Sequence, residues 1–415
     1  MDSPYRPGFG AKPAVLVGRD LQLARAQAAL TRIENSGQSR SAAMVFTGSR
    51  GLGKTVTLGV IGDRAASRGF TVAAVSMDRV SDNIQIIVAA VAEALRPLES
   101  TGRSRAWQQF KDRMAALSIE FSAGIVKIVA DAPQRSVRAA ATVQRQVLAS
   151  LLVDAAVLSR EHDKPGLVLL IDELQEAPSD QLVVLANAIQ DATKAAHAPL
   201  GIFAAGLPQT PELVMAAASF TERFDFRTLG RLDHIAAERA LLEPALDLGV
   251  RWDPAAAAAA LDYAGGSPYL IQYIGDETWL QAGPAARSVL SMAHFAAAMV
   301  EVRESLDHGM FRGRWAKATP AEQAVISAIA QVSDGRGVAA TAAISAALGV
   351  ESNAWSMFRR SLMDKGIIEA AGHGLLTFTI AGFAEFVLQL GAGPDDVRPG
   401  SIIQRRANPA LESGQ

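Results

Sequence analysis

The sequence contains no cysteine, which excludes disulfides, zinc ribbons, iron–sulfur clusters and cysteine nucleophiles together. It also lacks an excess of one charge: 40 Lys and Arg nearly balance 42 Asp and Glu, so no global basic field drives nucleic-acid binding. No apolar run is long enough to predict a membrane span, and the polar residues 1–7 do not have the pattern of a secretory signal. We therefore expect a soluble, cytoplasmic protein in which any DNA contact comes from a local patch.

What the sequence does have is a hydrophobic content of 49% over 415 residues, enough for two or three domains with cores of their own. In the first half, short apolar runs alternate with helical patterns, which predicts an α/β fold with a parallel sheet. The strand-like runs are Ala43–Thr47, Thr71–Met77, Leu167–Ile171 and Leu200–Ala205, and the helical patterns include Asn83–Leu95 and Asp180–Ala196.

Two alternating runs, Leu117–Ser122 and Ile125–Val129, interrupt this rhythm and predict a β-hairpin insertion within about 97–140. Its edge is either a contact surface or simply packed on the core. The expected domains are an N-terminal tail at 1–13, a core at 14–232, a helical lid at 233–312, a C-terminal unit at 319–390 and a disordered tail at 391–415.

The segment Gly48–Thr55 fits the pattern GxxxxGKT, the Walker A motif, and lies between a predicted strand and a predicted helix. Its glycines let the backbone direct N–H groups around phosphate oxygens, and the following helix N-terminus adds a favourable dipole. Lys54 can reach the β- and γ-phosphates, and the Thr55 hydroxyl can bind Mg²⁺. The predicted nucleotide-binding residues of this segment are Gly48, Ser49, Arg50, Gly51, Leu52, Gly53, Lys54, Thr55 and Val56.

A second motif, Leu167–Glu173, is an apolar strand that ends in two acids, as in a Walker B motif. In a parallel sheet this places carboxylates at the C-terminal edge, where ligands bind. Asp172 would hold Mg²⁺ through its coordinated water, and Glu173 would orient or deprotonate the attacking water. Glu173 and Lys54 are therefore predicted catalytic residues, and Thr55 and Asp172 predicted metal ligands. A strand that ends in a solvated acidic turn is the alternative.

The glutamate directly after the Walker B aspartate is similar to AAA+ and STAND ATPases. Val17–Asp20 resembles the "VGR-acid" box that lies beside the adenine in AAA+ proteins of the origin-recognition initiator group, and with Pro7–Gly10 before it the chain looks like an actinobacterial-type member. The resemblance implies a P-loop NTPase core of the AAA+ (ASCE) type, ATP as the nucleotide, and adenine contacts at Val17 and Gly18. A plain N-terminal turn is the alternative for this segment.

Glu222–Phe224 resembles the position from which AAA+ proteins offer an arginine finger to a neighbour's ATP. This implies a homo-oligomer in which Arg223 is catalytic in trans, because a permanent planar charge suits a developing phosphoryl charge. Arg227 and Arg231 lie close enough to be confused with it, and an ordinary surface ion pair is the alternative.

The chain departs from the AAA+ pattern in two places. Ala204–Leu207, at the end of the fourth predicted strand, offers no side-chain amide or hydroxyl where AAA+ proteins place the water-positioning sensor 1 residue. Gly265–Leu270 stands where initiators carry an arginine-bearing sensor 2 motif and looks more like the GxP motif of STAND ATPases, which implies a nucleotide contact at Pro268. A glycine helix stop followed by a proline helix start is the alternative. Both departures predict slow hydrolysis.

The C-terminal unit is predicted to contain three helices and a hairpin around Gly372–Gly374, beginning with a capping box at Thr319. It resembles the winged helix-turn-helix that ends origin-recognition initiators, in which the third helix enters the DNA major groove. The implied DNA-binding residues are Arg359, Arg360 and Lys365. The unit is not basic, because residues 316–390 contain five Lys or Arg and six Asp or Glu, so a protein-binding or structural role stays open.

Two functions follow from these patterns. The first is an ATP-binding, slowly hydrolysing AAA+ ATPase that acts as a nucleotide-dependent, DNA-associated assembly factor through its winged helix. The second is a STAND-like regulatory switch that binds an unknown protein partner and not DNA. Salt-dependent DNA binding distinguishes them, because phosphate contacts release counterions.

Overall fold

The computed structural model describes residues 1–8, 10–37, 43–101, 107–108, 110–113, 134–195, 198–335 and 337–391, and these form two compact units. The sheet unit comprises residues 19–48 and 53–229. The C-terminal unit comprises residues 1–18 and 49–52 together with the described chain from residue 230 onward.

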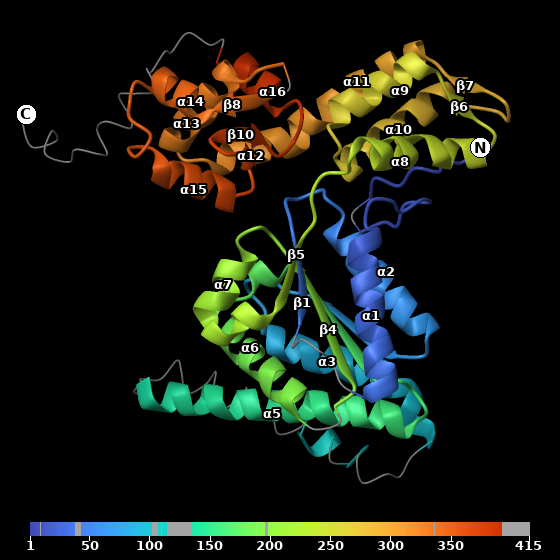
Figure 1. The fold of residues 1–415 in the computed structure, drawn as a ribbon, viewed down its shortest axis with the longest axis vertical. Helices are drawn as coiled ribbons and strands as arrows, with labels where there is room; N and C mark the ends of the chain where they lie inside the picture. The colour runs from blue at the N-terminus through green and yellow to red at the C-terminus, as the bar shows by residue number, and fades with distance from the viewer. Residues whose placement is uncertain are drawn as a thin grey trace, which may run out of the picture. The chain divides into compact units, whose positions relative to one another are not determined.

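The sheet unit is built on five parallel strands in the order β2-β3-β4-β1-β5 (Figure 1). β1 and β4 are buried along their whole length, which explains their continuous apolar sequences. β4 lies between β1 and β3, so the strand before the Walker A loop and the strand that ends in the Walker B acids are separated by one strand. The strands are β1 (Met44–Thr47), β2 (Thr71–Ser76), β3 (Leu167–Asp172), β4 (Leu200–Gly206) and β5 (Asp225–Thr228). The predicted α/β class is confirmed.

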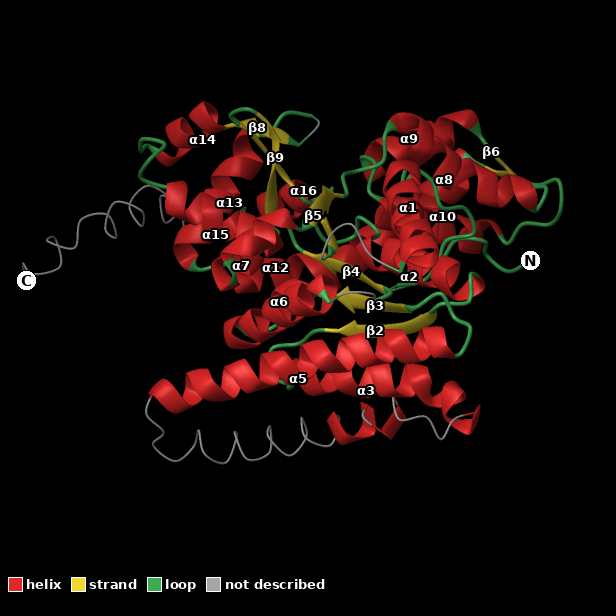
Figure 2. Ribbon diagram, turned by 60° about the horizontal axis from the view of Figure 1, so that its bottom comes forward, coloured by secondary structure: helices red, strands yellow, loops and turns green. Residues whose placement is uncertain are grey.

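Helices cover both faces of this sheet (Figure 2). One face packs against α1 (Asp20–Ser36) and α2 (Lys54–Ser67), and the other against α3 (Asn83–Leu95), α5 (Gln134–Glu161) and α6 (Ser179–Lys194). Shorter elements connect them, namely η1 (Arg96–Thr101), η2 (Leu174–Glu176), α7 (Thr210–Ala217) and η3 (Ser219–Arg223).

The 28-residue helix α5 is not among the predicted helices, and it begins inside the region predicted to be an insertion. The two strands of the predicted hairpin, at 117–122 and 125–129, lie outside the described residues. Residues 392–415 of the predicted tail also lie outside them.

The C-terminal unit begins with a helical part and the N-terminal segment that packs on it. Tyr5 is 3% exposed; its hydroxyl donates to the Leu241 carbonyl at 2.5 Å and accepts from Trp252 Nε1 at 2.8 Å. Gly275 gives the Tyr5 ring its space, because a Cβ there would lie 2.6 Å from the ring. The elements of this part are α8 (His234–Asp247), β6 (Arg251–Trp252), α9 (Pro254–Ala264), α10 (Pro268–Ala282), β7 (Val289–Leu290), α11 (Met292–Ser305), η4 (Leu306–Phe311) and α12 (Arg312–Lys317).

The last part of the unit, residues 319–391, has the three helices and the hairpin that the sequence predicts. Its first helix begins with the predicted capping box: Thr319 Oγ1 accepts from Glu322 N at 3.4 Å, and Glu322 Oε2 accepts from Thr319 N at 2.6 Å. A third strand, β8, and a last helix, α16, were not predicted. The elements are α13 (Pro320–Val332), β8 (Val338–Ala340), α14 (Thr341–Leu348), α15 (Ser356–Asp364), β9 (Ile368–Gly372), β10 (Leu375–Phe378) and α16 (Phe383–Leu390).

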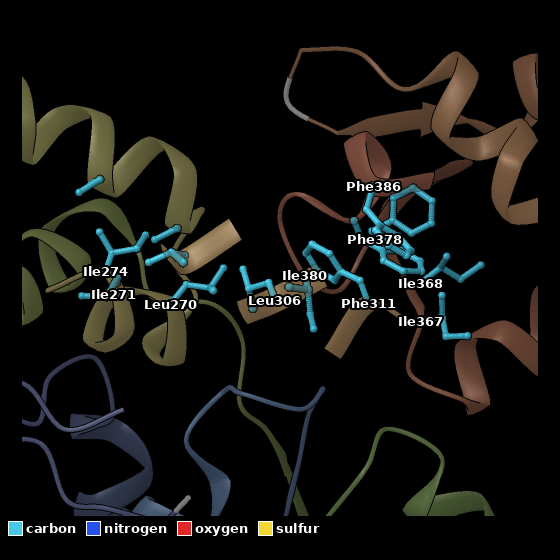
Figure 3. Close-up of a cluster of buried hydrophobic side chains, with 14 of the residues drawn as sticks. Leu270, Ile271, Ile274, Leu306, Phe311, Ile367, Ile368, Phe378, Ile380 and Phe386 are labelled. Carbon is cyan, nitrogen blue, oxygen red and sulfur yellow. The ribbon is translucent and has the colours of Figure 1, made fainter. Parts of the chain in front are cut away.

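One apolar cluster runs through the whole C-terminal unit (Figure 3). It includes Leu270 and Ile274 of α10, Phe311 of η4, and Ile368 and Phe378 of the hairpin. Burial of this surface stabilises the helical part and residues 319–391 against each other as one core.

Within the described ranges, no helix combines the length and the apolar character that crossing a membrane requires.

Candidate nucleotide site

The Walker A loop connects the end of β1 to the start of α2. Gly51 and Gly53 have φ values of +82° and +79°, a region that favours glycine. Gly53 is the N-cap residue of α2 and no side chain caps the helix, so the N–H groups of the first turn give this end the partial positive charge that favours an anion. Gly48 N donates to the carbonyl of Gly206 at 3.3 Å, which ties the loop to the end of β4. The loop thus has the backbone geometry that a phosphate-binding site requires.

The side chains of this loop differ in exposure. Lys54, the first residue of α2, is 6% exposed, and Thr55 and Val56 follow it in the first turn. Ser49 and Leu52 are also buried, whereas Arg50 is exposed. A buried ammonium at a helix N-terminus favours a nearby anion, because charge in a low-dielectric site must be compensated.

The Walker B acids follow β3. Asp172 is 8% exposed, and its Oδ1 accepts from Glu173 N at 2.8 Å. Glu173 has a φ of +50°, one of three positive values among the described non-glycine residues. A residue held in this conformation is strained, and such strain persists where the surroundings fix it.

The register of the sheet places the loop and the acids at the same edge. Thr47 pairs with Gly206 across β1 and β4, and Ile171 pairs with Ala204 across β4 and β3. Two strand spacings separate β1 from β3, which is roughly 10 Å. The structure therefore brings the ends of the loop and both acids together at one edge of the sheet unit.

The oxygen donors at this edge fit Mg²⁺. Among the described residues, no group of three or more His, Cys, Asp or Glu could hold a metal by itself. Mg²⁺ does not need such a cage, because it is usually held by one or two protein oxygens together with water and substrate phosphates. Thr55 and Asp172 can supply those two oxygens.

One residue at this edge is not among the site residues predicted from the sequence. Gln175, in the turn after Glu173, is 7% exposed; its Oε1 accepts from Leu207 N at 2.9 Å, and its Nε2 donates to Glu173 Oε2. It brings a side-chain amide to the end of β4, where the sequence of β4 provides none. The signal available was a glutamine two positions after an acidic pair, but its direction depends on the turn.

In the C-terminal unit, the residues predicted to contact adenine and nucleotide occupy two packed turns. Val17 is 5% exposed, and Gly18, with a φ of +68°, lies so close to the segment before α8 that a Cβ would come within 2.7 Å of Leu232. At the other turn, Gly265 ends α9, Ser267 Oγ caps α10, and Pro268 is the first residue of α10. This is the glycine stop and proline start. The same turn also contacts the Walker A loop, because Tyr269 N donates to the Gly51 carbonyl at 3.3 Å.

The three candidate arginines are in different states. Arg227 forms an ion pair with Asp225 at 2.6 Å. The guanidinium of Arg231 is held by one carboxylate and three carbonyls, namely Glu369 Oε1 and the oxygens of Gly265, Phe378 and Thr379. Arg223 is exposed, and within the described ranges its side chain has no hydrogen bond or ion pair. Of the three, Arg223 is thus the one whose side chain makes no such contact within the described residues.

The three predicted DNA-binding residues also differ. Lys365 Nζ pairs with Glu322 Oε2 at 2.6 Å and donates to the Lys317 carbonyl at 3.1 Å. Arg359 lies over the Trp355 ring, 5.9 Å from its centroid, and Arg360 is exposed on the same helix. α15 thus presents two arginines, while the ammonium of Lys365 holds the domain together.

The carboxylate of Glu322 is the buried centre of that contact. Burial alone would raise its pKa, but hydrogen bonds from Lys365, Ser361 and Thr319 outweigh burial and lower the pKa to about 2. Glu322 is therefore ionised at neutral pH and fixes Lys365 in place.

Comparisons with known proteins agree with this geometry. Residues 15–202 match the model of the AAA ATPase domain, and residues 308–387 match a domain of unknown function, DUF8462. Residues 15–202 thus carry an AAA ATPase domain, and the fold is that of P-loop NTPases. Among curated proteins, none matches this chain.

Two solved structures resemble the chain over nearly its whole length. The Walker-type ATPase PABY2304 of Pyrococcus abyssi has a TM-score of 0.58 and 12% identity, covering 94% of this chain and 98% of that one. The ORC2 protein of Aeropyrum pernix, solved as ADPNP–ADP complexes, has a TM-score of 0.56 and 16% identity, covering 97% of this chain and 98% of that one. At these identities the likeness shows a shared fold.

Proposed function

We propose that the protein binds ATP with Mg²⁺, hydrolyses it slowly, and uses the nucleotide state to control its C-terminal unit, which associates with duplex DNA as part of an assembly. The observation that carries the proposal is the single sheet edge at which the Walker A loop, Asp172 and Glu173 meet. The AAA ATPase domain over residues 15–202 supports it independently.

Each residue of this edge has a role that follows from its chemistry. The backbone N–H groups of the loop and the α2 N-terminus bind phosphate oxygens, and Lys54 adds a point charge. Thr55 and Asp172 hold Mg²⁺, which when bound neutralises charge that develops on the phosphate oxygens. Glu173 orients the attacking water and accepts its proton. Slow turnover follows from the absence of an arginine in Gly265–Leu270, the segment that stands where initiators carry sensor 2.

The link from nucleotide to the C-terminal unit runs through the middle of the Walker A loop. Ser49 Oγ donates to Glu369 Oε2 at 2.7 Å, and Gly51 accepts from Tyr269 N at 3.3 Å. Arg231 holds the same carboxylate through its Nε at 3.0 Å. Phosphate bound by this loop repels the Glu369 carboxylate, so nucleotide favours its release from Ser49.

The neighbourhood of Glu369 is otherwise cationic. Burial and the nearby charge of Arg50 lower the pKa of Arg314 to about 10, while Glu369 opposes that shift. An anion that replaces the carboxylate therefore meets Arg231, Arg314 and Arg50. The cationic surroundings of Glu369 within the C-terminal unit thus favour an anion in its place, which is the differential interaction that a switch requires.

Assembly supplies the catalytic arginine. Arg223 is exposed and belongs to the short helix η3 of the sheet unit, so it can enter the site of a neighbouring copy. We propose that turnover per subunit rises with protein concentration for this reason.

For the C-terminal output, Arg359 and Arg360 on α15 favour phosphate contacts with DNA. A second candidate is an unidentified protein partner, with no DNA contact. It is favoured by two observations: Lys365 is committed to Glu322, and Met357 on the same helix is 69% exposed.

The test is binding of mixed-sequence duplex DNA by the full chain with ATP, with ADP and without nucleotide, over a salt series. Tight binding that requires ATP and weakens with salt supports the DNA role. Lys54→Ala should abolish nucleotide binding, and Glu173→Gln should keep binding while removing hydrolysis. No DNA binding in any state, with ATP binding intact, would refute the DNA role and leave the protein-partner switch.

A further inference from the structure

The end of β4 has no room for a side chain of its own. A Cβ at Gly206 would lie 2.9 Å from Gln175 Oε1 and would overlap the Thr210 hydroxyl. The space next to the strand end is thus already filled by an amide from the turn after the Walker B acids and by a hydroxyl from α7. Thr210 is fully buried, and its Oγ1 has no hydrogen-bond partner among the described residues.

Gln175 is fixed at both ends of its amide. The oxygen accepts from Leu207 N at 2.9 Å, which orients the amide so that its nitrogen points to Glu173. The same nitrogen lies 3.3 Å from Glu176 Oε1. Because β4 separates β3 from β1, a Glu173 carboxylate drawn toward the end of β4 is turned to the side on which the Walker A loop begins.

We propose that Gln175 is the positioning residue of this ATPase: its amide holds the Glu173 carboxylate over the end of β4 and does the work that a polar side chain on β4 does in AAA+ proteins. The proposal rests on the proposed hydrolysis of ATP. It assigns the water-orienting polar group to the turn after β3 and explains why β4 ends in Ala204–Leu207 without one.

The positive φ of Glu173 contributes to the same arrangement of Glu173 and Gln175. A left-handed residue reverses the chain within one turn, so that Gln175, two positions later, points back toward the sheet edge. The amide donates to an ionised carboxylate, which is a stronger bond than one between neutral groups and fixes the side-chain torsions of Glu173. Holding a general base in a reactive orientation accelerates the chemical step without changing substrate affinity.

The test compares Gln175→Leu with Gln181→Leu in the full chain. Gln181 is the matched control, because it is a half-buried glutamine of the same unit that bonds to Asn83 and to the Ser81 carbonyl. We expect Gln175→Leu to lower kcat at least about tenfold with the KM and the Kd for ATP within about twofold, and Gln181→Leu to leave all three nearly unchanged.

A double-mutant cycle separates positioning from general damage. If Gln175 acts through Glu173, then adding Gln175→Leu to Glu173→Asp, which keeps a carboxylate but shortens its reach to the amide, causes little further loss of kcat. Additive losses, an unchanged kcat, or a kcat that rises because the amide restrains an inactive Glu173 would each overturn the proposal. Wild-type protein without ATP turnover, or Lys54→Ala protein that still turns over, would instead refute the proposed function itself.

If Gln175→Leu does not fold, Gln175→Asn is the second variant. Its amide is one methylene shorter, so it cannot bridge Leu207 N and Glu173, while its polarity and packing are nearly conserved. It should show the same loss of kcat at unchanged ATP affinity, and a wild-type kcat would overturn the proposal.

Discussion

Replacing Glu369 with Gln removes the negative charge that lies against Ser49 of the Walker A loop and leaves a side chain of the same shape. The carboxylate lies 2.7 Å from Ser49 Oγ. Ser49 belongs to the phosphate-binding loop, and for a phosphate held by that loop we take a separation from the carboxylate of about 6 Å, roughly twice the length of one hydrogen bond. Like unit charges about 6 Å apart repel by about 2.8 kcal/mol at an effective dielectric constant of 20.

Arg231 compensates part of this repulsion, because it pairs with the same carboxylate at 3.0 Å. If Arg231 compensates half of the repulsion, about 1.4 kcal/mol remains, which corresponds to about a tenfold change in the affinity for ATP. We therefore expect Glu369→Gln to bind ATP about tenfold more tightly than wild type. The gain should be smaller for ADP, which carries less charge, and should shrink as salt rises.

The assay is equilibrium titration of a fluorescent ATP analogue, with Glu351→Gln as the control. Glu351 is an exposed acid of the same domain, so the control makes the same change in net charge away from the loop. An unchanged or weaker affinity in Glu369→Gln would refute the reasoning, and so would an equal gain in both variants. Hydrogen exchange of β9 in wild-type protein gives an independent check, because ATP should increase exchange there.

Three further predictions concern stability, assembly and DNA. Glu322 has a folded-state pKa of about 2, below its ordinary value near 4.5, so its charge stabilises the fold above pH 4.5 and this contribution is lost as pH falls toward 2. Glu322→Gln should therefore lower the unfolding free energy by about 3 kcal/mol at neutral pH. Between pH 4.5 and 2 it should also flatten the pH dependence of the unfolding free energy, which denaturant titrations at several pH values measure. Arg223→Ala should bind ATP normally but lose the rise of turnover per subunit with protein concentration, and an unchanged rise would exclude it as the finger. Replacing Arg359 and Arg360 with Ala should lower the slope of log affinity against log salt by about two for duplex DNA, whereas an unchanged slope would show that α15 does not touch phosphates.

Much of the fold could be predicted because its signals are local. Buried parallel strands have continuous apolar sequences, and glycine and lysine at fixed spacing mark the turn between β1 and α2. The capping box at Thr319 fixes the start of α13 to the residue. Helix α5 was not predicted because its first turns follow a segment whose alternating pattern indicated a hairpin. Hydrophobic pattern alone does not fix the boundary between a hairpin and the helix that follows it.

In the candidate site, too, the features that depend on contiguous residues could be predicted and those that depend on distant contacts could not. The phosphate loop and the Walker B acids could be predicted because each is a contiguous motif. The roles of Ser49 and Arg231 could not, because both depend on Glu369, which is 320 residues from Ser49 and 138 from Arg231. Likewise, the resemblance to a winged helix made Lys365 a candidate for DNA contact, whereas its pairing with buried Glu322 depends on how α13 and α15 pack.

The sensor 1 gap shows most clearly why a motif read along one strand can mislead. Read as sequence, Ala204–Leu207 indicates a missing function, since the strand has no polar side chain to offer. In the folded chain the glycine at 206 leaves the needed space, because a Cβ there would overlap the Thr210 hydroxyl and lie 2.9 Å from the Gln175 amide oxygen. The absence of a polar side chain on β4 and the presence of the Gln175 amide after β3 are then one feature. Gly206→Ala should consequently lower kcat to the same extent as Gln175→Leu, although it removes no polar atom, and a Gly206→Ala protein with wild-type kcat would show that the amide's place does not matter.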